Sequence, residues 1–525
     1  MALQQTRCWL RSQYFGPCAT LPARSRRTHR SLHRSRSSQV SASAAPASAS
    51  PATLEWLRNE LQEEKSLLAP LRVEDSKVVL ANDVDAKQLV GQIPQQCVVT
   101  VADVESDEDL SAACAGRGEL IGLTMWLLKQ RKARQLNPSF SNSWDSLLQD
   151  LPIATNSPLL WSASETKQFL QGTTLVAEVN ARLEALQQEY EQIMLILREQ
   201  ESSSGDAQGL TAASLDEFVA AFAVVLKHVT FLPSAQVFAI VPLVCNMDLK
   251  YKPSPATPSP GQSAYDRTPR ISAGNGTDSK PKVFVEVDYD FDTESVQLLS
   301  ASSAAAGALV CLPLSEELSS ADVLLSYGVV DEEALNGLVT DYVNLEATLV
   351  NTDKMYDLKK EIVENEGFTA TQRFPIFVDR FPIQLLTYLR LTRIQDPIEI
   401  AKIDFSKDIQ VSVEIEYEVL QILMGDCRVA LAEFASSSYE DEMRLLNDET
   451  SERERLGACL RLMQKRIYIN TMDSVRRRLA PIRGVPTKSG KLEDPNKDIL
   501  EIFDTIENLP KDLMNGKFFK RFFED

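Results

Sequence analysis

Histidine is almost absent from this 525-residue chain. Two of its three histidines, His29 and His33, lie in the first 50 residues, so the remainder holds only His228. This scarcity excludes a metal site built from clustered histidines and leaves one candidate for a histidine-dependent nucleophilic triad. The local sequence "VVLKHVTF" predicts that His228 is an ordinary residue near a helix end.

Other absences remove further classes of protein. The chain has no phosphate-binding G-x-x-x-x-G-K-[ST] or G-x-G-x-x-G motif, and no C-x-x-C pair among the cysteines beyond the first 50 residues. Those six cysteines are predicted to be reduced, mostly buried thiols. No apolar run reaches the ~18 residues needed to span a bilayer. Asp288, Asp290 and Asp292 resemble a calcium loop, but Thr293 and Leu299 replace its glycine and glutamate. We therefore expect a solvated acidic strand face and no metal.

The first 50 residues differ from the rest. They contain eight arginines, many serines and alanines, and no acidic residue; the first acid is Glu55. This composition is typical of an organelle transit peptide, with a disordered basic arm as the alternative. The composition favours the plastid over the mitochondrion.

The charge of the remainder is strongly negative. The whole chain carries −19 and the leader carries +8, so residues 51–525 carry −27. Such a surface repels phosphate backbones and anionic lipid. Nucleic-acid binding is therefore not expected.

Apolar periodicity predicts several helices and one conspicuous strand. Residues 119–132 and 174–200 have helical spacing, and Ser214 with Glu217 forms a capping-box pattern before another helix. The stretch "FAIVPLVCNMDLK" (238–250) is predicted to be a buried strand that ends on Asn246 and Asp248. Polar residues at the end of a buried strand are a common basis for a binding site.

Two segments have a different composition. Residues 251–281 hold six prolines and three glycines and are predicted to form a disordered or loosely held loop. A linker follows Pro481, and the chain ends in "NGKFFKRFFED", whose four phenylalanines would share one side of a helix. Docking onto the protein's own body is the simpler interpretation of this tail, and docking onto a partner is the alternative.

Four stretches, in order, resemble one family. They are "ELIGLTMWLLKQR…SFSNSWDSLLQDLP…PLLWSASETKQFLQGT" (119–173), "SLDEFVAAFAVVLKHVTF…FAIVPLVCNMD" (214–248), "SSADVLLSYGVVDEE" (319–333), and "NTDKMYDLKKEIVENEG" (351–367) with residues 431–467. Together they resemble SET-domain protein lysine methyltransferases of the Rubisco large-subunit methyltransferase type. The resemblance spans roughly residues 70–480.

The resemblance implies an α+β fold. We expect a SET-like domain over 51–335, with a helical insertion at about 110–230, and an all-α substrate-binding-like domain over 336–480. A linker and aromatic tail would occupy 481–525. The family's chemistry is direct methyl transfer from S-adenosylmethionine to a lysine amine that enters by a narrow channel, and it depends mainly on positioning.

The family's Asn-His pair, which holds the cofactor, is not retained here. Aligning Pro242 with the family's proline puts Asp248 and Leu249 at these positions, and a leucine side chain can neither donate nor accept a hydrogen bond. A two-residue shift would bring Asn246 into place but would still supply no histidine. Asn246 and Asp248 are therefore the candidate cofactor-binding residues.

Two further elements of the family depart from its pattern. The position of the family's tyrosine, counted from Gly307 or from Tyr327, falls on Leu314, so no catalytic residue is assigned. Tyr327 matches the channel-lining tyrosine. The glycine-rich cofactor strand corresponds to residues 72–94, which have no glycine before Gly91. A side chain there would block close approach of the backbone to a ligand.

These departures favour a non-catalytic protein of the plastid stroma. We expect it to bind a plastid protein partner, as an interaction or assembly factor, through its helical domain and without a cofactor. The alternative is an active protein-lysine N-methyltransferase that uses S-adenosylmethionine on a plastid protein such as the Rubisco large subunit. An enzyme of another class is disfavoured by the shortage of histidine and of paired catalytic carboxylates.

Overall fold

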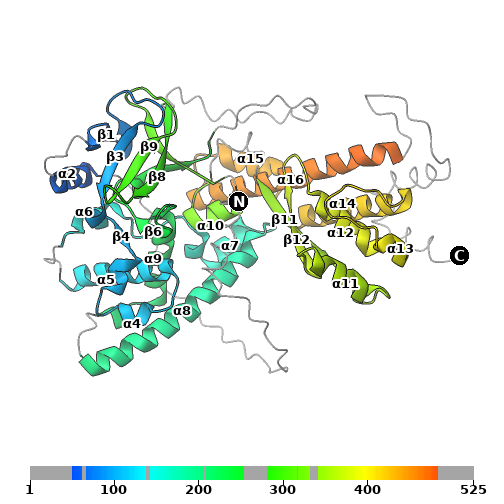
Figure 1. Cartoon of the computed structure of the whole chain (residues 1–525), viewed down its shortest axis with the longest axis horizontal. Coiled ribbons are helices and arrows are strands. Elements are labelled where there is room, and N and C mark those ends of the chain that lie inside the picture. Colours follow the sequence, from blue (N-terminus) through cyan, green and yellow to red (C-terminus); the bar gives the residue numbers. More distant parts are fainter. Residues whose placement is uncertain are drawn as a thin grey trace. The chain divides into compact units, whose positions relative to one another are not determined.

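The computed structural model describes residues 50–61, 67–137, 142–204, 209–252, 281–315, 317–330 and 341–482. These residues form two compact units (Figure 1). The first takes its residues from Met1–Ser162, Glu178–Ser315 and Val323–Val329, and the second from Ala163–Ala177, Glu316–Asp322 and Val330–Asp525. The predicted transit peptide, the proline-rich loop, and the linker with the aromatic tail lie outside the described residues, apart from residues 50, 251–252, 281 and 481–482.

The first unit contains a seven-stranded sheet. Its order is β1 (Leu71–Glu74), β2 (Lys77–Leu80), β10 (Leu309–Pro313), β8 (Lys282–Asp290), β9 (Ser295–Ser300) and β3 (Leu89–Pro94), and β7 (Asp248–Lys250) also pairs with β10. Both β7 and β8 run parallel to β10, whereas the other pairs are antiparallel. Strands far apart in the sequence therefore meet at β10.

A second, three-stranded sheet belongs to the same unit. It has the order β4 (Val99–Thr100), β6 (Val237–Ile240) and β5 (Val229–Leu232). Val241, Leu243 and Val244 join Val283, Val285 and Val310 of the larger sheet in one buried core. That shared core fixes the 241–249 segment against both sheets.

Helices lie between the first strands and β5 in the sequence. They include α3 (Val101–Glu105), α4 (Ser111–Cys114), α5 (Glu119–Leu136), α6 (Asp145–Asp150), α8 (Leu175–Ser204) and α9 (Leu215–His228). The capping box before α9 is present, because Ser214 accepts from the Glu217 amide and Glu217 accepts from the Ser214 amide. The long helices predicted at 119–132 and 174–200 are thus observed with slightly longer bounds.

The single strand predicted for 238–250 is wrong. Strand β6 ends at Ile240, a 3₁₀ turn spans Val244–Asn246, and β7 begins at Asp248. Pro242 has no amide hydrogen to donate to a ladder, and Leu243 adopts the left-handed backbone region with φ of 64°. The apolar residues reflect burial of a turn rather than a continuous strand.

The second unit is mainly helical. It comprises α7 (Ala163–Phe169), α11 (Tyr356–Asn365), α12 (Ile383–Arg393), α13 (Pro397–Ile400), α14 (Val413–Glu433), α15 (Ser438–Leu446) and α16 (Glu452–Ile482). Helix α10 (Ser320–Tyr327) contributes residues to both units. The core contains Leu385, Leu389, Leu420, Leu423 and Ile467 from α12, α14 and α16.

The expectation that residues 336–480 are all-α needs a correction. Strands β11 (Tyr342–Thr348) and β12 (Thr371–Phe377) form an antiparallel pair in full register. Their physical basis is visible in β11, where Val343, Leu345 and Ala347 are buried and alternate with exposed residues. The α+β fold class itself is confirmed.

The second unit also buries several ion pairs. Arg390 donates to both carboxylate oxygens of Glu416, at 2.7 and 2.9 Å, and to Asp408 at 2.7 Å. Asp441 accepts from Arg461, Lys465 and Ser436. Segment 163–177 joins this unit through Glu165, which pairs with Arg453 at 3.0 Å. Removing one partner of such a pair leaves a buried charge without a counter-charge, which is strongly destabilising.

Candidate functional site

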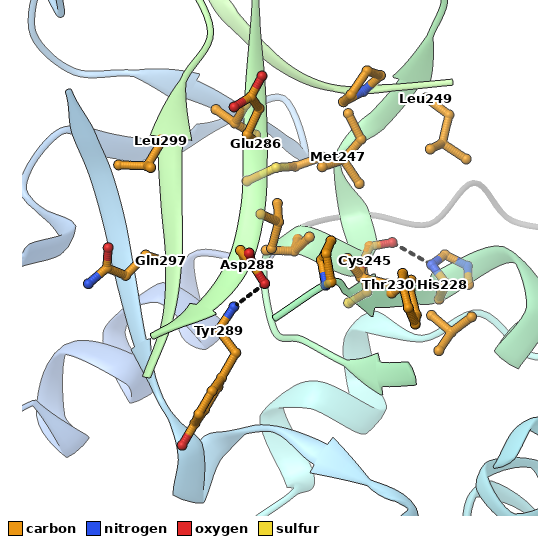
Figure 2. Close-up of a pocket in the computed structure, with 18 of the residues that line it drawn as sticks. His228, Thr230, Cys245, Met247, Leu249, Glu286, Asp288, Tyr289, Gln297 and Leu299 are labelled. Carbon is orange, nitrogen blue, oxygen red and sulfur yellow. Dashed lines mark hydrogen bonds between the residues drawn. The ribbon is translucent and has the colours of Figure 1, made fainter. Parts of the chain in front are cut away.

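A cavity of about 660 Å³ opens in the first unit (Figure 2). Its wall is built by the end of α9, strand β5, the 244–249 segment, the facing side chains of β8 and β9, and the end of β10, with Tyr327 from α10. Cavities of this size accommodate small ligands. This is the place where the two sheets and the end of α10 bring together sequence-distant residues.

His228 is a buried member of this wall. Its Nδ1–H donates to the Cys245 carbonyl oxygen at 2.5 Å, and only 3 % of the residue is exposed. Burial lowers the pKa of His228 to about 3, so the ring is neutral. Nε2 is then a lone-pair acceptor, and it has no hydrogen-bond partner within the described part of the chain. Sequence reasoning treated this histidine as ordinary, since its position at a helix end gave no signal of the cavity.

The 3₁₀ turn and the residues after it present apolar side chains to the cavity. Cys245, Met247 and Leu249 line it (Figure 2), whereas Asn246 and Asp248 do not. Val244 and Cys245 reach the cavity from the 3₁₀ turn, and side-chain alternation in the extended chain that follows puts Met247 and Leu249 on the cavity side and Asp248 on the other. The cavity wall formed by this segment is therefore apolar.

Both predicted cofactor-binding side chains have partners elsewhere. Asn246 is buried, and its Nδ2 donates to Asp150 Oδ2 at 3.2 Å. Burial raises the pKa of Asp150. Asp248 pairs with Lys77 Nζ at 2.8 Å near the protein surface. Neither Asn246 nor Asp248 lines this cavity, and their assignment as cofactor-binding residues stays a prediction.

Of the two positions predicted from the tyrosine spacing, Tyr327 lies in the cavity wall and Leu314 does not. Tyr327 lines the cavity, and burial raises the pKa of its hydroxyl. Leu314 is only 4 % exposed and is not part of the wall, although Leu312 and Pro313 are. Its backbone N–H donates to the Lys250 carbonyl at 2.8 Å, which extends the β7–β10 pairing by one residue.

Acidic side chains of β8 border the opposite wall. Asp288 accepts from the Ser234 amide at 2.8 Å and from the Ser234 hydroxyl at 2.7 Å. Asp290 accepts from Thr293 and Gln297. These carboxylates are held by local donors rather than gathered round one point. No group of three or more His, Cys, Asp or Glu side chains placed to hold a metal occurs in the regions that the structure describes.

The sequence is similar to one family model and to named chloroplast lysine methyltransferases. Residues 350–467 match the family model "Rubisco LSMT substrate-binding". The chain is 23 % identical over 425 residues to [fructose-bisphosphate aldolase]-lysine N-methyltransferase, chloroplastic, of Arabidopsis thaliana, covering 78 % of this chain and 80 % of that one. It is 22 % identical over 411 residues to the chloroplastic Rubisco large subunit N-methyltransferase of Nicotiana tabacum, covering 76 % of each.

Solved structures agree on the fold. A crystal structure of the SET domain of LSMT bound to lysine and AdoHcy aligns with a TM-score of 0.61 at 19 % identity, covering 86 % of this chain and 98 % of that one. A structure of Rubisco LSMT bound to AdoMet aligns with a TM-score of 0.60 at 19 % identity, covering 87 % and 100 %. The chain is therefore similar, over most of its length and in its fold, to SET-domain proteins of the Rubisco large-subunit methyltransferase type.

On the alignment predicted from the sequence, the residues at the family's cofactor positions do not supply the hydrogen-bonding groups expected to hold S-adenosylmethionine. Leu249, at the histidine position, lines the cavity with a side chain that can neither donate nor accept. Asp248, at the asparagine position, is paired with Lys77 outside it. Leu314, at the tyrosine position, supplies no hydroxyl. A cavity is present beside Leu249, and the apolar side chains of its wall differ from the polar pattern that the sequence resemblance implies.

The described part of the chain has no helix that is both long and apolar enough to cross a membrane.

The six cysteines of the described residues are all free, and burial raises the pKa of the Cys97, Cys114 and Cys427 thiols to about 12. Thiols with raised pKa values are poor nucleophiles. Cysteine chemistry is therefore disfavoured at these positions.

Proposed function

We propose that this protein is a non-catalytic SET-fold protein of the chloroplast stroma that acts as an interaction or assembly factor through its helical substrate-binding-like domain. The observation that carries the proposal is the apolar wall at Cys245, Met247 and Leu249, on the side of the cavity where the family's Asn-His pair would bind the cofactor. Buried ligand groups without partners cost about 1–3 kcal/mol each, so several lost contacts together would abolish useful affinity.

The composition supports the same proposal. The arginine-rich, acid-free leader favours import into a plastid, and the named relatives are chloroplastic. The strongly acidic remainder favours a protein partner over nucleic acid. The helical domain matches a family model described as substrate-binding, so protein recognition is the activity that this part would retain.

The alternative is an active protein-lysine N-methyltransferase that acts on a plastid protein such as the Rubisco large subunit. It is favoured by the open cavity, by Tyr327 in its wall, and by the unsatisfied Nε2 of His228. Lys227, Glu286 and Asp288 also line the cavity and are charged groups that could replace some lost contacts. We place this second because none of these groups occupies a position of the family's cofactor pair.

Calorimetric titration of the full chain with S-adenosylmethionine separates the two functions. The non-catalytic proposal expects no binding heat up to about 1 mM cofactor, a weak limit corresponding to roughly −4 kcal/mol. Incubation with stromal extract and methyl-labelled S-adenosylmethionine should then label no protein above a sample without this chain. Micromolar binding together with a newly methylated lysine would replace the proposal with the enzyme.

A further inference from the structure

Helix α15 buries Leu445 and the charged Asp441 against its own unit and exposes three large apolar side chains on its other face. Tyr439, Met443 and Leu446 are 69 %, 46 % and 58 % exposed, respectively. Their spacing of four and then three residues puts them within an arc of about 60° on the helix. We call these three residues the α15 stripe. Asp441 lies on the opposite face and is fully buried.

The buried ion pairs hold the stripe outward. Asp441 accepts from Arg461 Nη2 and Lys465 Nζ, each at 2.6 Å, and from Ser436 Oγ at 2.9 Å. Arg461 and Lys465 belong to α16, beside α15 in the same unit (Figure 1). Rotating α15 to bury the stripe would separate Asp441 from Arg461 and Lys465 and leave buried charges without a counter-charge, which is strongly destabilising.

The surroundings of the stripe are acidic. Glu440 and Glu442 flank it on the two sides of the helix, and Asp448 and Glu449 follow its C-terminal end. Glu442, Asp448 and Glu449 form no ion pair with any residue that the structure describes, whereas Arg444 is engaged by Asp441 and Glu454. The stripe is thus an apolar patch within an unneutralised negative border. Apolar anchors bordered by charge of one sign are features of protein-docking surfaces.

We propose that the α15 stripe docks a segment of another protein whose apolar side chains are bordered by lysine and arginine. The apolar anchors would cover Tyr439, Met443 and Leu446, and the basic border would pair with Glu442, Asp448 and Glu449. The docking proposal rests on the proposed function, because it takes the partner to be a plastid protein. It adds the surface to which that partner binds and the chemistry of the contact.

Site-specific photocrosslinking of the full chain tests the proposal. Benzoylphenylalanine replaces Met443, and the protein is irradiated in stromal extract before the crosslinked peptide is sequenced. The matched control carries the same group at Ile398 of α13, which is 67 % exposed in the same unit. We expect a crosslink at 443, absent at 398, to a peptide of another protein that contains apolar residues beside lysine or arginine.

Further variants of the protein that carries the crosslinker at 443 test the apolar stripe and its acidic border separately. Tyr439→Ser with Leu446→Ser should reduce the crosslink at least about tenfold, since removing aromatic and apolar anchors weakens interfaces by this much. Glu442→Lys with Glu449→Lys should reduce it as well, whereas Ile398→Ser should not. All of these side chains are at least partly solvent-exposed, so folding should be unaffected, and circular dichroism checks this.

Several outcomes would overturn the proposal. They are a crosslink no stronger than that at 398, a crosslink only to this chain's own residues or to a second copy, and a crosslink to an acidic segment. None of these depends on S-adenosylmethionine. Failure here is therefore distinguishable from failure of the proposed function, which would appear as cofactor binding and lysine methylation.

Discussion

Lys465 Nζ lies 2.6 Å from Asp441 Oδ2, and both side chains are shielded from solvent. The same carboxylate receives Arg461, so one buried acid on α15 satisfies two buried cations on α16. Burial alone would raise the pKa of Asp441, but hydrogen bonds from Arg461 and Lys465 outweigh it and lower that pKa. Charge pairing at Asp441 therefore acts together with the burial of Leu445 against Ala458, Cys459 and Met463 to hold α15 on α16.

Asp441→Asn should lower the free energy of unfolding by about 3–5 kcal/mol, because it leaves two buried cations without a counter-charge. The measurement is chemical denaturation at pH 7. Glu440→Gln is the matched control on the same helix, since Glu440 is exposed and only caps the helix through Ser437. That control should cost no more than about 1 kcal/mol. Equal losses for the two variants would contradict the role assigned to the buried pairs.

Arg390 and Glu416 allow a test of whether a buried ion pair makes the protein more stable than a pair of apolar side chains at the same positions would. Arg390 is fully buried and Glu416 nearly so. Arg390→Met alone should cost about 3–5 kcal/mol, whereas Arg390→Met with Glu416→Leu should recover most of the loss, since neither charge then remains buried at this pair. A double-mutant cycle by denaturation measures the difference. If the double variant is less stable than the single one, the desolvation argument fails at this site.

The helical scaffold was the most predictable part of the structure. Helices α5, α8 and α9 followed from apolar spacing and from the Ser214 capping box, because amphipathic period and cap chemistry are local properties. The β11–β12 pair was missed, although Val343, Leu345 and Ala347 alternate with exposed residues. Alternation over seven residues within a long helical region is a weak signal.

The site was less predictable because it depends on side-chain direction. Asn246 and Asp248 were selected for their chemistry and their place after an apolar run. The turn at Pro242 and Leu243 directs Cys245, Met247 and Leu249 to the cavity instead. Pro242 is a local signal that the strand is interrupted, but it does not indicate which of the following side chains face the cavity. His228 joined the site only through the tertiary contact with Cys245.

His228 should make folding stability pH-dependent in a range where few other groups titrate. Burial lowers its pKa from an ordinary value of 6.5 to about 3, so the folded protein binds fewer protons than the unfolded chain. Its contribution to stability is present above pH 6.5 and is lost as the pH falls from there toward 3. Between pH 8 and pH 5 the loss from this group should reach about 2 kcal/mol.

Denaturation at several pH values measures this effect. His228→Asn retains a donor near the position of Nδ1 but does not titrate, so its stability should change less between pH 8 and pH 5 than that of the wild type. The two remaining histidines belong to the first 50 residues, and a variant with His29→Asn and His33→Asn serves as the control. If this control, rather than His228→Asn, flattens the pH dependence, the assignment to His228 is wrong.

Leu249→His combined with Leu314→Tyr tests why the cavity would lack cofactor affinity. Leu249 already lines the cavity, so a histidine there would place a hydrogen-bonding group in the wall. Leu314 is buried beside Leu312 and Pro313, and a tyrosine there must move to reach the cavity. We therefore expect Leu249→His alone to give measurable S-adenosylmethionine binding in the millimolar range, and the double variant to bind no more than about tenfold more tightly.

Calorimetry of both variants, with Leu314→Tyr alone as the control, distinguishes two causes. If Leu249→His restores binding, the cavity is correctly shaped and lacks only polar groups. If neither variant binds while both remain folded by circular dichroism, the shape of the cavity excludes the cofactor. If Leu314→Tyr alone restores tight binding, the buried placement of residue 314 is incorrect, and the cavity is closer to a working methyltransferase site than its apolar wall indicates.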